Sequence, residues 1–232
     1  MMPRFLASRR GEGLLAALSL AVLAVCGYYG YLFLRVATFN GIVDPISWRV
    51  VKDLPGCERP ADCLLEGDRV LSIDGVTHEQ YLQARAETPI DWLGEVTFRV
   101  LRGDSELTIV VAPGEPAPSQ LIAAVSLLLL PALFWLMGLV AVLFLRPRDE
   151  RWLVLVLFFH VTAVLFAAGS LSSTLLAYSS VVLHVLTWIF CPLILHVHLI
   201  LPTDAFPRAR RWLPLFYAAA GAGIVLDLTR VL

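Results

Sequence analysis

The sequence predicts a membrane protein of five transmembrane helices, with a small α+β, mainly β domain inserted after the first helix. Composition is one reason. The 232 residues are 58% hydrophobic and 16% charged, whereas a soluble domain has about 45–50% apolar and 25% charged residues. Their arrangement is the other, because one apolar block precedes an acidic segment, residues 35–120, and four more blocks follow it.

Five apolar blocks are long enough to cross a bilayer as helices. A hydrocarbon core of roughly 30 Å needs about 20 consecutive apolar residues in a helix. The blocks are residues 14–34, 121–145, 152–171, 175–201 and 212–231.

Arginine placement predicts the orientation of these spans. Three arginines precede the first span, three lie between the second and third, and three lie between the fourth and fifth: Arg4, Arg9, Arg10; Arg146, Arg148, Arg151; Arg208, Arg210, Arg211. With five spans these segments share one side, which the positive-inside rule makes cytoplasmic. We therefore expect residues 1–13 in the cytoplasm and the 35–120 segment outside, because long domains cross largely regardless of charge.

The N-terminus resembles a secretory signal, since arginines precede an apolar run. That run is too long for a typical signal core, and no small-residue cleavage site follows Leu34. A retained anchor is favoured over a cleaved signal. The chain stops at Leu232, directly after the fifth block, so we expect a fragment of a longer protein.

Between the first two spans, hydrophobicity changes from continuous to alternating. Residues 96–100 and 107–111 alternate apolar and polar side chains around a turn signal at residues 102–105, which predicts a β-hairpin. Residues 69–73 are a further short strand, and residues 48–51 are a fourth candidate. The predicted core of this domain is residues 48–111.

Two local signals complete the domain. Asp74-Gly75 is a strong turn dipeptide and ends the strand at residues 69–73. Residues 77–87 are predicted to be helical, with Thr77 as the N-cap.

Cys57 and Cys63 are predicted to form a disulfide. Both lie outside in the expected topology, in a compartment that permits disulfides, and a bridge over so short a loop stabilises by roughly 2 kcal/mol. A Cys-x5-Cys pair with no nearby histidine is not a zinc signature. Cys26 and Cys191 fall inside spans, where we expect small apolar residues.

Ionisable residues inside spans are functional suspects. His160 and His184 are each about twelve residues from the uncharged connection near residues 172–173. If the two spans that flank this connection are antiparallel helices, the histidines are expected at similar depth in the membrane. One interpretation is an intramembrane pair for a haem, a metal or a proton. The other, which we favour because suitable partner groups are few, is two separate histidines, each bonded to a backbone carbonyl or a neighbouring helix. Asp227 is expected to pair with Arg230.

The stretch from Leu65 to Gly75, Leu-Glu-Gly-Asp-Arg-Val-Leu-Ser-Ile-Asp-Gly, followed by a short helix and a hairpin, resembles a bacterial PDZ domain over residues 48–111. The resemblance implies that a turn at Gly67 and Asp68 opens a core strand. It also implies that the Asp74-Gly75 turn leads to a helix that walls a peptide groove.

In such domains a peptide adds a strand to an open sheet edge and backbone N–H groups hold its carboxylate. The groove strand would be Trp48, Arg49, Val50 and Val51, although we find no clear carboxylate-binding loop. A PDZ-like fold that serves only for packing or dimerisation is the equal alternative.

The C-terminal part carries a second resemblance. Residues 195–202, Leu-His-Val-His-Leu-Ile-Leu-Pro, are followed by Phe-Pro-Arg at 206–208 and by Trp-Leu-Pro-Leu-Phe-Tyr at 212–217. This order is similar to the multi-span sensor regions of bacterial membrane histidine kinases, some of which carry an external PDZ-like domain. The resemblance implies a two-component signal-transduction input region in a bacterial inner membrane, and a homodimer.

Neither a phospho-acceptor helix nor ATP-binding glycine motifs occur in this chain, so we do not expect it to be an enzyme by itself. A non-enzymatic membrane scaffold is the alternative. An intramembrane protease is disfavoured, because no His-Glu-x-x-His motif is present. Expected partners are an external peptide or protein and the lipid bilayer. No cofactor or metal is expected, and nucleic acid is excluded because basic residues gather only beside the spans.

Overall fold

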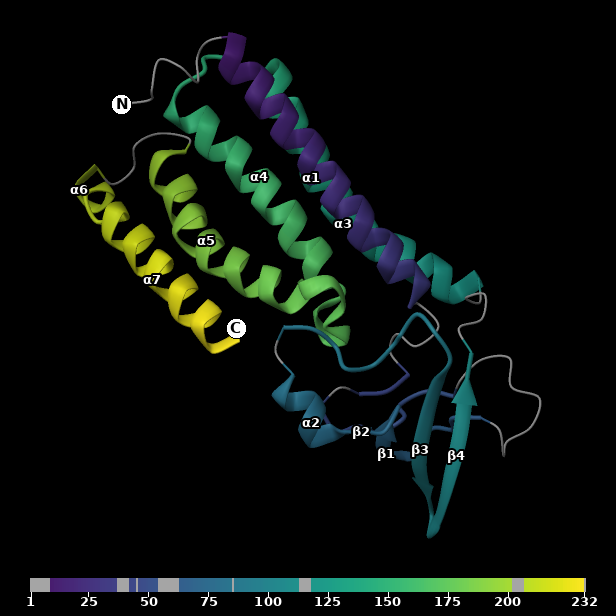
Figure 1. The fold of residues 1–232 in the computed structure, drawn as a ribbon. Coiled ribbons are helices and arrows are strands. Elements are labelled where there is room, and N and C mark those ends of the chain that lie inside the picture. Colours follow the sequence, from purple (N-terminus) through teal and green to yellow (C-terminus); the bar gives the residue numbers. More distant parts are fainter. Residues whose placement is uncertain are drawn as a thin grey trace.

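The computed structural model describes residues 9–36, 42–44, 46–53, 63–84, 86–112, 118–201 and 207–231. A small β-sheet domain, here called the module (residues 42–112), lies against one end of a helical bundle (Figure 1). The long helices are α1 Arg9–Arg35, α3 Pro118–Phe144, α4 Glu150–Gly169, α5 Ser179–Ile200 and α7 Leu213–Val231. Within the described residues, five helices are long and apolar enough to cross a membrane, which confirms that prediction.

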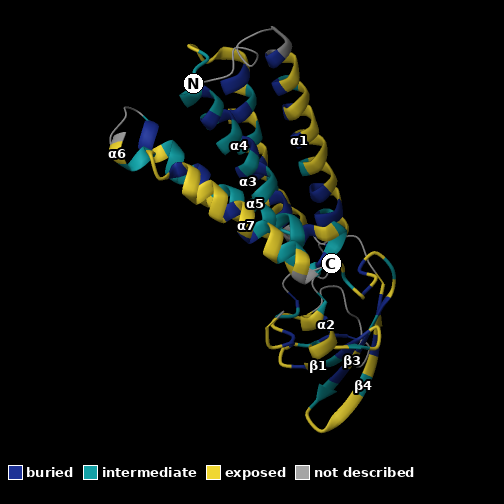
Figure 2. Cartoon of the chain, turned by 60° about the vertical axis from the view of Figure 1, so that its left-hand side comes forward, coloured by how far each residue is buried: buried dark blue, intermediate teal, exposed yellow. Residues whose placement is uncertain are grey.

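Helix α4 lies at the centre of the bundle. It packs against α1, α3 and α5, and α7 packs against α5. Residues along the outward faces of α1 and α7 are exposed (Figure 2), and many of them are apolar, such as Leu20 and Val225. An apolar exposed face of this length suits a hydrocarbon environment, where helices satisfy their own backbone groups.

The two ends of the bundle differ. The module and the end of α7 lie at one end, while the start of α1, the α3–α4 connection and the short helix α6, Pro207–Arg210, lie at the other (Figure 1). The three arginine-bearing segments therefore share one end, as alternation of five spans requires. Which end faces the cytoplasm stays a prediction from the positive-inside rule.

The module contains a four-stranded antiparallel sheet in the order β2-β1-β3-β4. Its strands are β1 Arg69–Ile73, β2 Val76–Thr77, β3 Val96–Arg102 and β4 Ser105–Val111. The predicted hairpin is present as β3 and β4, with Arg102 opposite Ser105. The 48–51 segment joins this sheet through an isolated bridge between Arg49 and Arg69, and a second bridge pairs it with residues 42–44.

Local sequence explains the next elements. Asp74 and Gly75 have φ angles of 51° and 78°, and positive φ at both positions is what a two-residue type I′ hairpin requires. Helix α2, His78–Gln83, is capped by Thr77, whose hydroxyl oxygen accepts from Gln80 N–H while the Gln80 side chain accepts from Thr77 N–H. This helix is shorter than predicted, because the backbone turns extended at Ala84.

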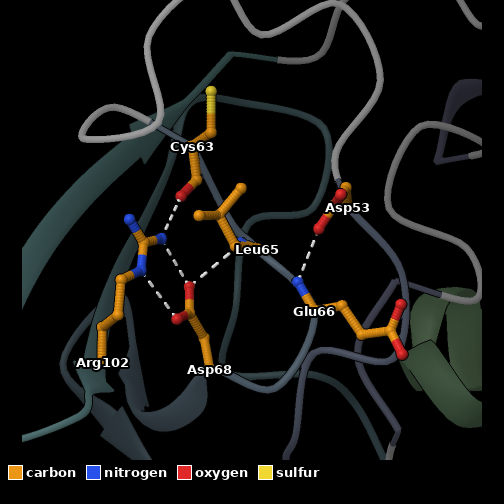
Figure 3. A network of polar contacts seen from close by, with 6 residues as sticks. All are labelled: Asp53, Cys63, Leu65, Glu66, Asp68 and Arg102. Atoms are coloured by element: carbon orange, nitrogen blue, oxygen red, sulfur yellow. Dashed lines mark hydrogen bonds and ion pairs between the residues drawn. The ribbon is translucent and has the colours of Figure 1, made fainter.

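A partly buried ion pair ties the turn before β1 to strand β3 (Figure 3). Arg102 donates two hydrogen bonds to Asp68, at 2.8 and 2.6 Å, and Leu65 N–H donates a third at 3.0 Å. Burial of Asp68 opposes its ionisation, but the bonds from Arg102 and Leu65, with the charge of Arg102, hold the pKa of the carboxyl below its usual value. The two residues thus stabilise the module in their charged forms.

The core of the module continues into the bundle. Residues at the end of α1, in the sheet and after α4 belong to one buried apolar cluster, which includes Phe33, Val36, Phe98, Leu171 and Leu175. The module is therefore packed against the helices and is not only tethered to them.

Candidate functional site at the module–bundle junction

A pocket of about 370 Å³ lies where the module meets the bundle. This volume is within the range of roughly 300–1,000 Å³ that small-molecule sites occupy. The module side of the pocket is lined by Ile46, Tyr81, Leu82 and Ala84. The bundle side is lined by Ser172, Ser173, Leu175, Ser180, Leu183 and His184.

The α4–α5 connection forms much of the bundle side. It consists of two 3-10 turns, Ser172–Thr174 and Leu176–Tyr178. Three non-glycine residues in it have left-handed backbone, Leu175, Ala177 and Tyr178, with φ of 57°, 49° and 57°. Such residues cost of order 1–3 kcal/mol each and persist only where surrounding contacts hold them.

Two tyrosines supply such contacts. Tyr81 of α2 donates its hydroxyl to the Ser173 carbonyl, and Tyr29 of α1 donates to the Ala177 carbonyl at 3.2 Å. Burial raises the pKa of Tyr81 to about 12, so its hydroxyl keeps the proton that it donates at neutral pH. The strained connection is thus bonded both to the module and to the first helix.

Trp48 positions α2 for this contact. Its indole stacks on His78 with ring centroids 4.9 Å apart and lies 5.6 Å from the ring of Tyr81. Only 3% of Trp48 is exposed. The aromatic ring therefore occupies the space between the 48–51 segment and α2, where the PDZ resemblance places a peptide.

The predicted groove strand is also paired on both of its edges. On one side, Val50 N–H donates to the Asp68 carbonyl at 2.9 Å and Trp48 accepts from Val70. On the other side, Arg49 accepts from Asp44 N–H and Val51 donates to Ile42. The segment Trp48, Arg49, Val50 and Val51 therefore has no open edge at these groups, because residues 42–44 already lie where an added peptide would pair. An added peptide strand would find these backbone groups already bonded, and peptide binding at this segment stays a prediction.

The turn residues of the PDZ resemblance shape the rim of the module. Gly67 has a φ of 93° and its N–H donates to the Val50 carbonyl at 2.8 Å. Asp74 accepts from Thr97 N–H through its carboxylate at 2.7 Å. These residues fix local backbone and take no part in the pocket.

The structure does not bring His160 and His184 together. No hydrogen bond or ring contact joins them within the described segments; His184 is exposed and lines the junction pocket. The expected equal depth fails because residues between Ser172 and Tyr178 form 3-10 turns outside the helices, so His184 lies only five residues into α5. The interpretation of two separate histidines fits this arrangement.

His160 instead belongs to a group of hydrogen bonds that joins α1, α3 and α4 inside the bundle. Its Nε2 lies 2.8 Å from the Ser19 hydroxyl of α1 and its Nδ1 lies 2.8 Å from the Val156 carbonyl. Trp135 of α3 donates to the Ser19 carbonyl at 2.9 Å. His160 and Ser19 are 2% and 1% exposed, so their contact cross-links α1 and α4 inside the bundle.

A second polar cluster, which sequence reasoning missed, lies at the opposite end of the bundle. Glu150 at the start of α4 forms an ion pair with Arg210 of α6, and its carboxylate lies 3.4 Å from Nε2 of His196 of α5. His196 also contacts the Tyr217 hydroxyl of α7 at 3.2 Å. The sequence did offer a signal for this cluster. Glu150 lies in one arginine-bearing segment, and the next such segment, which contains Arg210, must lie at the same end of the bundle, where the two can pair.

The cysteines and Asp227 complete the predicted residues. Cys63 is disulfide-bonded, and Cys57 lies outside the described residues, so the pairing stays a prediction. Cys26 and Cys191 are free. Asp227 accepts a hydrogen bond from the Trp188 indole of α5 at 2.6 Å.

The described part of the chain holds no cluster of three or more histidine, cysteine or acidic side chains able to bind a metal ion. Comparison with protein-family models finds no match, and neither curated proteins nor solved structures show significant similarity to the chain.

Proposed function

We propose that this chain is the membrane sensor or input region of a signal-transduction protein, in which the junction pocket receives the signal. The observation that supports it most is the physical continuity between module and bundle. One apolar cluster includes side chains of both, and Tyr81 bonds the module directly to the connection between α4 and α5.

The strained connection offers a way for a signal to move the helices. A ligand shifts an equilibrium only if it binds one state more tightly than the other. Residues held in left-handed backbone by a few contacts can relax when those contacts change. A ligand in the pocket touches Tyr81, Ser173 and Leu175, so it acts on the contacts that hold the strain.

The order of an anchor helix, a module with PDZ-like turns and four further spans supports a bacterial histidine kinase sensor. The positive-inside rule supports a module outside the cytoplasm. The catalytic domain of such a kinase would belong to another part of the protein.

The decisive experiment removes one hydroxyl from the junction. Tyr81→Phe keeps the ring but loses the hydrogen bond to Ser173, worth about 1 kcal/mol. We expect amide hydrogen exchange in nanodiscs to rise about five-fold in residues 170–178 and to rise also in α4 and α5. Tyr31→Phe, at a 57% exposed position of α1, is the matched control.

A change confined to α2, with α4 and α5 exchanging as in the unmodified protein, would show that the module does not communicate with the bundle. The sensor proposal would then be wrong.

One observation favours the scaffold alternative. Strand β4 is at the edge of the sheet, and an unpaired edge can accept a strand from another protein. If the module only recruits a partner, Tyr81→Phe leaves the bundle unchanged, whereas a proline at Thr108 abolishes partner binding.

A further inference from the structure

We propose that the junction pocket binds an uncharged amphiphile, with an alkyl or acyl chain and a hydroxyl, ester or amide head, that enters from the bilayer. The ligand class follows from the lining and the position of the pocket. Only the role of the bound ligand as a signal rests on the proposed function.

The lining chemistry sets the head group. None of the ten lining residues is aspartate, glutamate, lysine or arginine. A charged head would lose hydration without gaining a countercharge, which is costly. Ser180 and His184 offer a hydroxyl and an imidazole that can donate to or accept from a neutral polar head.

The apolar lining sets the tail. Ile46 and Leu82 of the module, with Leu175 and Leu183 of the bundle, supply aliphatic surface on both sides of the pocket. Ile46 and Leu82 are 82% and 62% exposed. Large exposed aliphatic side chains around a pocket are typical of a site for an apolar ligand or a membrane.

The position of the pocket sets the route. Helix α5 begins at Ser179, so Leu183 and His184 lie about 6–8 Å along it, at a rise of 1.5 Å per residue. The pocket therefore spans the level at which this candidate membrane span meets the module. A molecule that partitions into the bilayer reaches this level with its tail in lipid and its head toward water.

Other ligand classes fit less well. An ion or a phosphate lacks the basic residues that would hold it. A peptide strand would need an open sheet edge, and the neighbouring 48–51 segment is paired on both sides.

The test uses the whole protein in phosphocholine nanodiscs and a photoactivatable analogue of 1-decanoylglycerol. We expect crosslinks on peptides that contain Leu82 and Leu183, saturable and displaced by unlabelled 1-decanoylglycerol. Decyl sulfate and decyltrimethylammonium carry the same chain with a charged head, and we expect each to compete at least about ten-fold more weakly, because a charge in this pocket is unpaired.

A pocket-filling variant provides the second arm. Ser180→Phe places a ring in the cavity and should reduce crosslinking by about ten-fold or more, since the ring takes up volume that the ligand needs. Ser126→Phe, at an exposed serine of α3, should leave it unchanged. If Ser180→Phe does not fold, two measurements on the unmodified protein decide whether the pocket binds an uncharged amphiphile. They are displacement of the probe by unlabelled 1-decanoylglycerol and its competition with the two charged compounds.

Unsaturable labelling spread along the exposed helices, or equal competition by the charged probes, would overturn the ligand assignment. This failure is distinct from failure of the sensor function. If the probe does not bind the pocket, the effect of Tyr81→Phe on amide hydrogen exchange can still support the sensor function. If the probe binds saturably but Tyr81→Phe leaves exchange in α4 and α5 unchanged, the sensor function is refuted and the ligand site remains.

Discussion

At the scale of single residues, close approach explains why certain small residues occur where they do. A Cβ on Gly138 of α3 would lie 2.5 Å from Cε1 of His160, and both nitrogens of that ring are already engaged. His160 was recognisable from sequence as a polar residue in a span. Its partner Ser19 was not, because the two are 141 positions apart and the pattern of one helix does not say which helix it meets.

We predict that Gly138→Ala destabilises the bundle by about 1–3 kcal/mol, because the added methyl group must displace a buried, hydrogen-bonded ring. Unfolding by SDS titration of the protein in mixed micelles measures this. Gly27→Ala on α1, where nothing lies within 4 Å of the new Cβ, should be neutral. Equal loss in both variants would mean that helix packing at His160 is looser than described.

We predict that Asp68→Asn destabilises the module by about 2 kcal/mol at neutral pH, less than for a fully buried pair because Arg102 is 25% exposed. The pKa of Asp68 is lowered on folding, so its stabilisation is present above the ordinary carboxyl pKa of 3.8 and is lost as pH falls through the folded value. The difference in module stability between Asp68→Asn and the unmodified protein should therefore shrink in acid.

Hydrogen exchange of β1 and β3 amides between pH 7 and pH 3, corrected for intrinsic rates, tests this dependence. Asp104→Asn at the exposed hairpin tip is the control. A gap that stays constant over this range would show that the Asp68 charge does not stabilise the module.

At the scale of elements, periodicity predicted most of the secondary structure. Alternation identified the β3–β4 hairpin, and the Asp74-Gly75 dipeptide and the Thr77 cap placed the turn and helix between strands. The α4–α5 connection was not predictable, because its left-handed residues are leucine, alanine and tyrosine, which carry no local signal for that backbone. The module edge was missed for a similar reason, since residues 42–44 have no strand pattern.

We predict that Gly223→Ala loosens α7 from α5. A Cβ at this position would lie 2.6 Å from the indole of Trp188, whose N–H is bonded to Asp227, so the ring cannot move without losing that bond. Amide exchange should increase along α7. Gly221→Ala, on the same helix in open space, is the matched control, and equal exchange in the two variants would contradict the packing.

At the scale of the whole molecule, the arginines predicted which segments share an end of the bundle, because charge acts on topology without any knowledge of packing. The pocket could not be predicted. It arises where α2 meets a connection about ninety positions later in the chain, as in the contact of Tyr81 with Ser173, and no pattern within either segment records the other.

We predict that a cysteine at position 104 reacts with a membrane-impermeant maleimide in intact cells, and that one at position 211 reacts only after permeabilisation. The two sites lie at opposite ends of the bundle, in the hairpin of the module and beside α6. Each is tested with Cys26 and Cys191 replaced by alanine. The reverse pattern would invert the orientation, and labelling of both in intact cells would rule out a membrane-spanning bundle.

The shared cluster of module and bundle also constrains how the protein is made. Val36, Phe98 and Leu171 pack in one core, yet the ribosome supplies Leu171 long after the sheet has been completed. Until α4 and the connection after it have been made, the apolar flank of the nascent module lacks its cover. Transiently exposed apolar surface of this kind makes folding intermediates prone to aggregation.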